Sequence, residues 1–303
     1  MNTLILSSGG TGSTILQRLL TLVYYIEKIE IVNTHDIVNK FMTLDDNGNI
    51  KRDGTIQYGQ TLEEIQQILV NSNRKTKLVS RLSKDHVDFR NDDSKDIHNF
   101  FNFINKFYEK KIFCDRKNTF ELAMSLAIKE KSKIYNIFSN KDRESVHQVD
   151  SVDEKRFLYY LKGYIDYRIW ITKNFDDSEL IYYEDVITDT DNVMYKMTGY
   201  KDTLKRYFGA PMASILRAEH DDNKSNMVNQ NALTKYKTLC DHLVEKQILR
   251  LVPVKNTSLR QKKSMIKNFK RCLKFFDRWT DTHNFVDKSV ATYDFWNQKR
   301  LTI

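Results

Sequence analysis

The sequence predicts an α/β protein with a mostly parallel sheet flanked by helices and with a helical C-terminal extension. Short β-rich segments alternate with longer segments of helical periodicity, which is typical of a parallel sheet covered on both faces. A glycine-rich corner joins the first predicted strand to the first predicted helix. The 303 residues include only 2 prolines and 9 glycines and show no linker, so we expect a single domain over 1–303, with a core at about 1–210 and the extension at about 211–303.

Each predicted strand is a short run rich in aliphatic or aromatic residues, and each predicted helix repeats apolar residues every three or four positions. Thr61 and Glu64 form a capping box that marks one helix start. The Asp-Asn-Gly and Arg-Asp-Gly sequences within 45–59 predict turns or a hairpin, and 85–93 is an Asp-rich loop. The expected strands are 3–7, 30–34, 77–83, 111–115 and 179–186, and the expected helices are 13–29, 61 onward, 97–108, 118 onward, 152–175, 193–208 and most of the chain beyond 211.

The composition is that of a soluble globular protein, with 40% apolar residues, 29% charged residues and a formal net charge of +9. The three cysteines, Cys114, Cys240 and Cys272, are far apart, which argues against a disulfide framework or a thiolate zinc site and predicts a reducing compartment. The apolar run at 14–26 is interrupted by a glutamine and an arginine and is shorter than the roughly 20 residues of a membrane span. We therefore expect a cytoplasmic protein without a membrane span.

The basic surplus is concentrated near the C-terminus, where 255–274 carries eight basic and no acidic residues. Apolar side chains recur there at helical spacing, so the segment predicts an amphipathic helix with a cationic outer face. A solvated helix face explains this pattern, and a surface that binds a polyanion is the alternative. The aromatic residues at 100–108 follow core-like spacing and form no RNA-binding motif, so nucleic acid is not an expected partner.

A candidate phosphate cradle follows the first predicted strand. Three glycines and four hydroxyl residues lie at this turn, so backbone N–H groups and the positive end of the helix dipole could converge on an anion. The spacing matches neither the Walker A motif, which needs a lysine before the final hydroxyl residue, nor GxGxxG. A turn that only closes the corner is the alternative. The candidate residues are Ser8, Gly9, Gly10, Thr11, Gly12, Ser13 and Thr14.

A second candidate phosphate contact follows the strand predicted at 111–115. Arg116 comes directly after this strand, and Ser125 lies nine residues later on the next predicted helix. At about 1.5 Å rise per residue, Ser125 lies some two turns into a helix that begins beside the arginine, so the guanidinium and the hydroxyl could hold the same phosphate. The acidic pair within 182–186 has two interpretations, a catalytic base or ionic and capping support of the sheet.

In this order, the three segments resemble the sulfotransferase family, particularly its bacterial and phage-type members related to trehalose and carbohydrate sulfotransferases. That family has a glycine- and hydroxyl-rich loop for the 5′-phosphosulfate, and an arginine and a serine nine residues apart for the 3′-phosphate, of 3′-phosphoadenosine 5′-phosphosulfate. In this chain, residues 8–14 are similar to that loop, and Arg116 with Ser125 is similar to that pair. Residues 183–186 are similar to a Tyr-Glu-Asp strand that follows later in the family. The resemblance covers roughly 1–210, and it implies a P-loop-like fold in which this part of the chain is the nucleotide-binding core.

The resemblance also implies in-line transfer of a sulfuryl group to a hydroxyl or amine of a saccharide or another small acceptor, with adenosine 3′,5′-bisphosphate as product. This reaction needs no metal, and the sequence shows no metal-ligand motif. A histidine that titrates near neutrality suits the general base. The resemblance favours His86, after the strand at 77–83, with His35 as the competitor and with Asp85 or Asp88 available to orient the His86 ring.

One position departs from the family pattern. Many sulfotransferases carry a lysine or arginine inside the first loop, where Gly10 stands here. The missing cation could come from Arg18, Arg81 or Lys84, the loop N–H groups could suffice, or the protein could bind the nucleotide without turnover.

Two other function classes stay open. The first is a non-catalytic nucleotide- or polyanion-binding protein. The second is a nucleotide kinase-like phosphotransferase, which needs a Walker lysine and a magnesium-binding acid that are not evident. If the chain is a sulfotransferase, we expect the acceptor pocket within 45–59, 85–93 and 159–170, where a saccharide, a lipid headgroup, a small alcohol or a protein tyrosine would be compatible.

Overall fold

The structure of the chain is a computed structural model that describes most of the first 249 residues. The residues it describes are 2–38, 43–44, 50–51, 61–73, 76–88, 94–117, 119–133, 149, 151–220, 230–246 and 248–249. The amphipathic helix expected within 255–274 and most of the turns expected at 45–59 lie outside these ranges.

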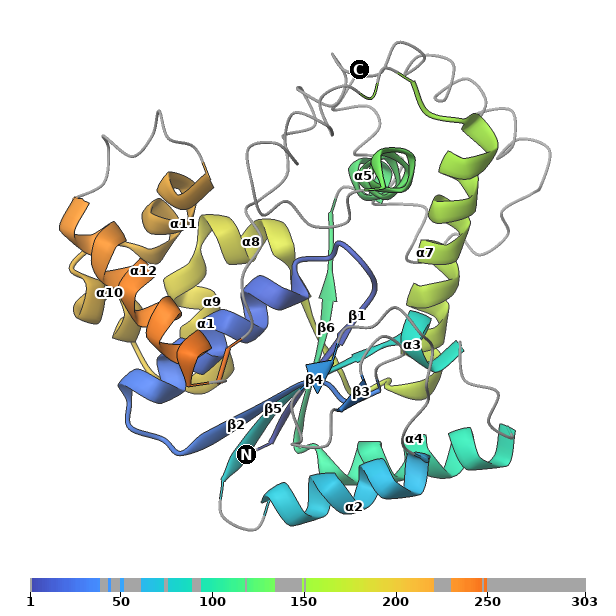
Figure 1. Cartoon of the computed structure of the whole chain (residues 1–303), viewed down its shortest axis with the longest axis horizontal. Helices are drawn as coiled ribbons and strands as arrows, with labels where there is room; N and C mark the ends of the chain where they lie inside the picture. The colour runs from blue at the N-terminus through green and yellow to red at the C-terminus, as the bar shows by residue number, and fades with distance from the viewer. Residues whose placement is uncertain are drawn as a thin grey trace.

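Within the described ranges, a five-stranded, all-parallel sheet forms the centre of the protein (Figure 1). The strand order is β2-β5-β1-β6-β7, so the first strand of the chain is the central one. This sheet confirms the expected α/β class. The strands are β1 (Thr3–Ser7), β2 (Ile31–Asp36), β5 (Lys77–Ser83), β6 (Lys110–Asp115) and β7 (Glu179–Tyr182), and the short β3 (Thr43–Leu44) and β4 (Ile50–Lys51) pair separately in antiparallel fashion.

The described helices are α1 (Ser13–Ile26), α2 (Leu62–Asn73), α3 (Lys84–Asp88), α4 (Ser94–Phe107), α5 (Thr119–Ser132), α7 (Glu154–Asn174), α8 (Tyr183–Thr188), α9 (Thr190–Thr198), α10 (Thr203–Phe208), α11 (Met212–His220) and α12 (Gln230–Glu245). They cover both faces of the sheet (Figure 1). Helices α2, α4 and α7 share one hydrophobic cluster with the sheet, and α1 shares the other with α8 to α12. Helix α5 packs beside α7.

The central strand β1 divides the core into two clusters because its successive side chains point to opposite faces of the sheet. Ile5 is buried together with α1 and the C-terminal helices, whereas Leu4 and Leu6 are buried together with α2, α4 and α7. Burial on both faces explains why this strand is a continuous apolar run rather than an alternating one.

Several expected elements are confirmed. Strands β1 and β5 coincide with the expected 3–7 and 77–83. The capping box is present, since the Thr61 N–H donates to Glu64 Oε2 at 2.6 Å and the Glu64 N–H donates to Thr61 Oγ1 at 3.1 Å.

Three expectations are wrong. The strand expected over 179–186 ends at Tyr182, because the acidic residues that follow lie in the first turn of α8, where carboxylates meet the positive end of the helix dipole. The helix expected over 193–208 is two helices, because Gly199, with a φ of 78°, ends α9 in the left-handed conformation. The first four residues of the loop expected over 85–93 belong instead to the short helix α3, and 89–93 lie outside the described ranges.

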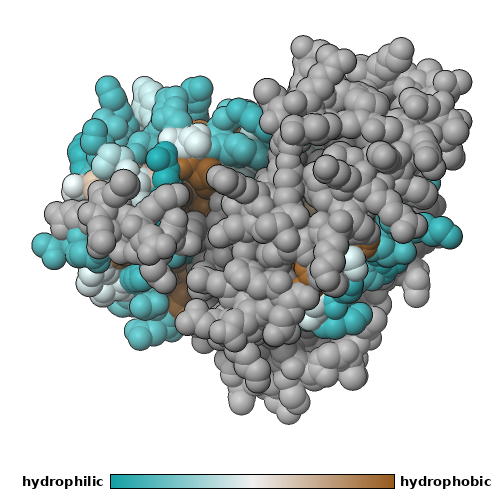
Figure 2. Space-filling view, turned by 90° about the horizontal axis from the view of Figure 1, so that it is seen from above, coloured by the Kyte–Doolittle hydropathy of each residue, from teal (hydrophilic) through white to brown (hydrophobic). Residues whose placement is uncertain are grey.

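The C-terminal helices are tied to α1. The guanidinium of Arg18 is buried, lies 3.2 Å from Glu219 of α11 and sits over the Tyr236 ring of α12, 5.5 Å from its centroid. Seen from above, the described surface over these helices is mostly hydrophilic (Figure 2). Every helix in the described ranges is too short or too polar to span a bilayer.

Candidate functional site

The carboxyl ends of neighbouring strands bring the expected site segments to one edge of the sheet. Strand β1 lies between β5 and β6, and Ser7 lies opposite Ser83 in the β1–β5 register. Because these strands run parallel, the loop at 8–14, Lys84 and Arg116 leave the sheet at the same edge. Ligands of open parallel sheets bind at this edge.

The loop between β1 and α1 is a fixed turn. Gly10 and Gly12 have φ values of 85° and 86°, in the left-handed region that favours glycine. Thr11 between them is fully buried, and its hydroxyl donates to the Ser8 carbonyl oxygen at 3.0 Å. The thiol of Cys114 on β6 donates to the Thr11 carbonyl oxygen at 3.3 Å, and burial raises the pKa of this thiol to about 12, so it keeps its proton.

Close packing also disfavours a side chain at the same two positions, most strongly at Gly12. A Cβ at Gly10 would lie 2.7 Å from Leu122 Cδ1 of α5, and a Cβ at Gly12 would collide with the ring of Tyr183 at the start of α8. Gly12 is also the N-cap of α1 and has no side chain to cap it. An anion can satisfy the first N–H groups of a helix in that position.

An ion pair lies beside the start of α1. Arg81 on β5 is opposite Asp36 on β2, and the Asp36 carboxylate accepts from Arg81 Nε at 2.5 Å and from Nη2 at 2.6 Å. The remaining nitrogen, Nη1, donates to Thr14 Oγ1 at 2.7 Å and to Ser13 Oγ at 3.3 Å. Burial alone lowers the pKa of Arg81, but the Asp36 carboxylate outweighs this and raises it, so the guanidinium stays charged. The pair thus connects β2 and β5 to the beginning of α1.

Arg116 is held against the start of α8. Its guanidinium lies over the ring of Tyr183, 4.7 Å from the centroid, and its Nε donates to Glu184 Oε1 at 3.2 Å. The same tyrosine ring lies against Gly12, so it connects the glycine loop with Arg116.

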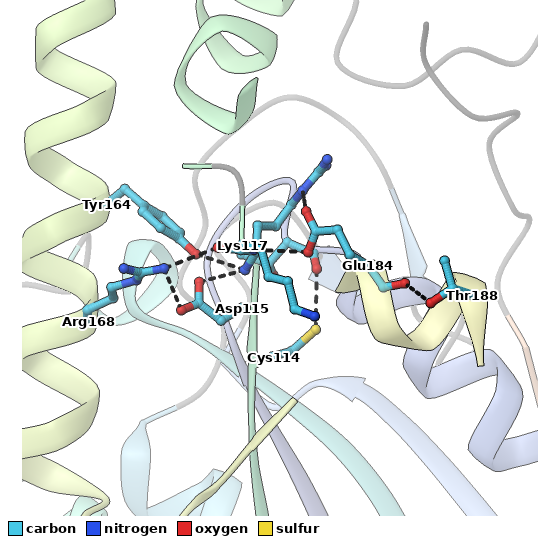
Figure 3. Close-up of polar contacts among 9 residues, drawn as sticks. Cys114, Asp115, Lys117, Tyr164, Arg168, Glu184 and Thr188 are labelled. Carbon is cyan, nitrogen blue, oxygen red and sulfur yellow. Dashed lines mark hydrogen bonds and ion pairs between the residues drawn. The ribbon is translucent and has the colours of Figure 1, made fainter. Parts of the chain in front are cut away.

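Side chains from α7 support the turn after β6 (Figure 3). Arg168 Nη2 lies 2.8 Å from Asp115 Oδ2 and donates to the Arg116 carbonyl oxygen at 3.1 Å. Burial raises the pKa of Asp115 to about 6, although the charge of Arg168 acts in the opposite direction. The Tyr164 hydroxyl accepts from the Arg116 N–H at 3.2 Å, and its ring lies under the guanidinium of Arg168.

The acidic pair of the third segment makes ionic contacts, which was one of its two expected roles. Glu184 Oε2 accepts from the Lys117 N–H at 2.9 Å, and Asp185 Oδ1 lies 2.5 Å from Lys117 Nζ. Figure 3 shows Glu184 of α8 on one side of this turn and Tyr164 and Arg168 of α7 on the other. The two carboxylates therefore bind α8 to the turn after β6.

The remaining candidate site residues lie on elements that begin or end at this edge of the sheet, except Arg18, which contacts the C-terminal helices. Ser125 is buried on α5, and Lys84 and His86 are half-buried on α3 directly after β5. His35 lies in β2, and its side chain, like those of Asp85 and Asp88, is outside the described ranges. Arg18 is engaged by α11 and α12, which removes it from the candidates for the loop cation.

Asp36 and Arg168 were not among the expected site residues, and Tyr164 was expected only within the acceptor region at 159–170, not against the turn after β6. Asp36 stands two residues beyond the strand expected at 30–34, and an acidic residue at the carboxyl end of a strand was an available signal. Tyr164 and Arg168 are four residues apart on one face of α7, so an arginine within that aromatic stripe was a second signal.

In the described part of the chain, no group of three His, Cys, Asp or Glu side chains is placed to hold a metal ion. Cys114 and Cys240 are both free and buried. Comparison of the chain with models of known protein families, with curated proteins and with solved structures finds no match. The geometry of the site is therefore the basis on which a function can be assigned.

Proposed function

We propose that the protein is a sulfotransferase that moves a sulfuryl group from 3′-phosphoadenosine 5′-phosphosulfate to a hydroxyl or amine of a saccharide or another small acceptor. One observation carries the proposal: the ring of Tyr183 lies against Gly12 of the loop and also under the guanidinium of Arg116. The segments that resemble the 5′- and 3′-phosphate sites of sulfotransferases therefore share one edge of the sheet. A single nucleotide with phosphates at both positions needs this arrangement.

In this proposal the loop at 8–14 binds the 5′-phosphosulfate through backbone N–H and hydroxyl donors at the positive end of the α1 dipole. Arg116, together with Ser125 of α5, binds the 3′-phosphate through charge-assisted hydrogen bonds. Arg81 on β5 and Lys84 directly after it are the candidates for the cation that the loop lacks.

The proposed reaction is a displacement at sulfur. The acceptor oxygen or nitrogen forms a bond to sulfur while the bond between sulfur and the 5′-phosphate oxygen breaks, and adenosine 3′,5′-bisphosphate leaves with that electron pair. His86 takes the proton of the acceptor, because α3 places it three residues after the end of β5 at the same edge of the sheet. Positioning and donors aimed at the leaving oxygen supply most of the acceleration.

Thermal unfolding with nucleotides tests the proposal. We expect adenosine 3′,5′-bisphosphate to raise the melting temperature more than AMP or ATP does in the absence of magnesium, because only the bisphosphate fills both phosphate sites. A ligand at 100 times its Kd stabilises the folded state by about 2.7 kcal/mol, which is roughly 5 °C for a chain of this size. Equal shifts for the three nucleotides would contradict a 3′-phosphate site and favour general nucleotide or polyanion binding.

Arg116→Ala should abolish the shift given by the bisphosphate, measured against the melting temperature of the ligand-free variant. Arg156→Ala is the matched control. Arg156 on α7 also pairs with a carboxylate, Glu130, and lies over a tyrosine ring, that of Tyr159, but it does so at the far end of α5. An equal loss of the shift in both variants would show that Arg116 has no specific part in binding.

His86→Ala separates binding from turnover. We expect this variant to keep the shift given by the bisphosphate and to lose transfer from a ³⁵S-labelled donor to a panel of hydroxyl compounds. Retained transfer would move the base to His35 or elsewhere.

A further inference from the structure

The Arg81 guanidinium beside the loop is shared between one carboxylate and two hydroxyls. Asp36 accepts from Nε and Nη2, and Nη1 donates to Ser13 and Thr14, the first two residues of α1. The Asp36 side chain is 3% exposed and the Arg81 side chain is 18% exposed, so both charges are largely removed from water. Every nitrogen of the guanidinium therefore has a fixed partner.

These contacts determine where the two hydroxyl hydrogens can point. A serine or threonine hydroxyl has one hydrogen to donate and two lone pairs that accept. Since Arg81 donates to the oxygens of Ser13 and Thr14, the hydrogen of each hydroxyl points away from the guanidinium. In the described ranges neither hydroxyl donates a hydrogen bond, so both hydrogens remain available at the start of α1, where backbone N–H groups also gather.

The same contacts limit what Arg81 can do as a charge. The carboxylate of Asp36 is in two-point contact with the guanidinium, so the pair as a whole is neutral. A neutral pair adds little to the positive field that a phosphosulfate would meet at the loop. Lys84, which follows β5 at the same edge, is then the cation candidate.

We propose that Asp36 and Arg81 are positioning residues of the donor site, which turn the hydroxyls of Ser13 and Thr14 toward the anion at the 5′-end of the bound nucleotide. Arg81 acts on the ligand through these hydroxyls and not as a counter-ion. The inference rests on the proposed function for the identity of the nucleotide, but its geometry concerns any phosphate bound at the loop.

A double-mutant cycle tests the proposal, with the Kd for adenosine 3′,5′-bisphosphate measured by calorimetry. We expect Arg81→Gln to weaken binding about 10-fold, the equivalent of about 1.4 kcal/mol or one hydrogen bond. In the background Ser13→Ala with Thr14→Val, the same replacement should change Kd less than about 2-fold, because the hydroxyls through which it acts are gone. A loss of about 10-fold in both backgrounds would show a direct contact and overturn the proposal.

Asp36→Asn tests whether removal of the carboxylate charge strengthens or weakens ligand binding. If Arg81 bound the phosphate directly as a cation, its charge would be partly neutralised by Asp36, and removal of the Asp36 charge would tighten binding of the nucleotide. We expect weaker binding, because the guanidinium is no longer fixed against the hydroxyls, and tighter binding would overturn the proposal.

Two further variants control for structure. Thr14→Ser keeps the hydroxyl and should keep the full dependence on Arg81, whereas Thr14→Val should reduce it to the part that acts through Ser13. Arg206→Gln removes an exposed arginine that pairs with Glu27 at the opposite end of α1, at 3.5 Å, and should leave Kd unchanged. A loss of binding in Arg206→Gln equal to that in Arg81→Gln would mean that both act through the stability of α1, and would also overturn the proposal.

Pyrophosphate as a second ligand separates this inference from the proposed function. If the protein binds pyrophosphate but not adenosine 3′,5′-bisphosphate, the sulfotransferase proposal fails, and the cycle measured with pyrophosphate still decides the role of Arg81. If the protein binds neither ligand, both proposals are overturned.

Discussion

Replacement of Gly12 by alanine would impose two separate costs on the loop before α1. A φ of 86° is left-handed, which costs a residue with a side chain about 1–2 kcal/mol. The new Cβ would also meet the Tyr183 ring, whose Cγ and Cε2 would lie 2.9 Å away with a third ring carbon closer still. Forcing a methyl group into such packing costs about 1–3 kcal/mol. We therefore expect Gly12→Ala to lower the free energy of unfolding by about 2–5 kcal/mol.

Gly199 is the matched control for this experiment. Its φ of 78° is equally left-handed, but a Cβ added there meets no atom within 4 Å. Gly199→Ala should therefore cost only the conformational part, about 1–2 kcal/mol, so the difference between the two variants isolates the contact with Tyr183. Unfolding in urea, followed by circular dichroism, measures both losses. Equal losses would refute the close approach of Gly12 and Tyr183.

The same pair of variants connects stability to ligand binding. Because the Tyr183 ring also lies under the guanidinium of Arg116, a ring displaced by Gly12→Ala no longer supports it. We expect Gly12→Ala to weaken the binding of adenosine 3′,5′-bisphosphate and Gly199→Ala to leave it unchanged.

Three other substitutions concern the supports of the site and the sheet. Gly163→Ala should raise the free energy of unfolding by about 0.5–1 kcal/mol, because this position is inside α7 and an added Cβ meets nothing within 4 Å; a lower urea midpoint would contradict that. Thr61→Ala should lower it by about 0.5–2 kcal/mol through loss of the capping box, and an unchanged midpoint would show that the cap is not formed. Asp115, with a folded pKa of about 6 against an ordinary 3.8, holds a proton that the unfolded chain has already lost, so stability should fall as the pH rises from about 4 to about 6. Asp115→Asn should remove this fall. If the free energy of unfolding in urea depends on pH in the same way in the unsubstituted protein and in this variant, the raised pKa of Asp115 is refuted.

The strands and the glycine corner could be predicted because their signals are local. Strand β1 is an apolar run that leads directly into a turn rich in glycine and hydroxyl residues, and the capping box of Thr61 and Glu64 needs only residues three positions apart. Such patterns reflect preferences that neighbouring residues set.

The contacts that assemble the candidate site could not be predicted in the same way, because they depend on strand order. Asp36 and Arg81 are 45 residues apart and meet only because β2 lies next to β5. Tyr183 reaches Gly12 because β7 and β6 bring the start of α8 to the end of β1. Alternation of strands and helices indicates a parallel sheet but leaves the order of its strands open.

The strand expected over 179–186 was too long for a different reason, because the start of α8 has a local signal in the sequence. The residues before it favour a strand, since isoleucine and tyrosine fit a pleated, half-buried surface. Glu184 and Asp185 nevertheless follow at once, and acidic residues in a first turn are a helix start signal. The acidic pair therefore marks the helix start, although the residues before it favour a strand.

The position of Arg18 limits how the protein can be shortened for expression. Its guanidinium points into α11 and α12, and the apolar side chains around it on α1 belong to the same hydrophobic cluster as those two helices. A fragment that stops near Pro211 would lack Glu219, the ion-pair partner of Arg18. It would also expose to water the apolar face of α1 that α11 and α12 cover. We expect such a fragment to aggregate, although every residue of the glycine loop would still be present in it.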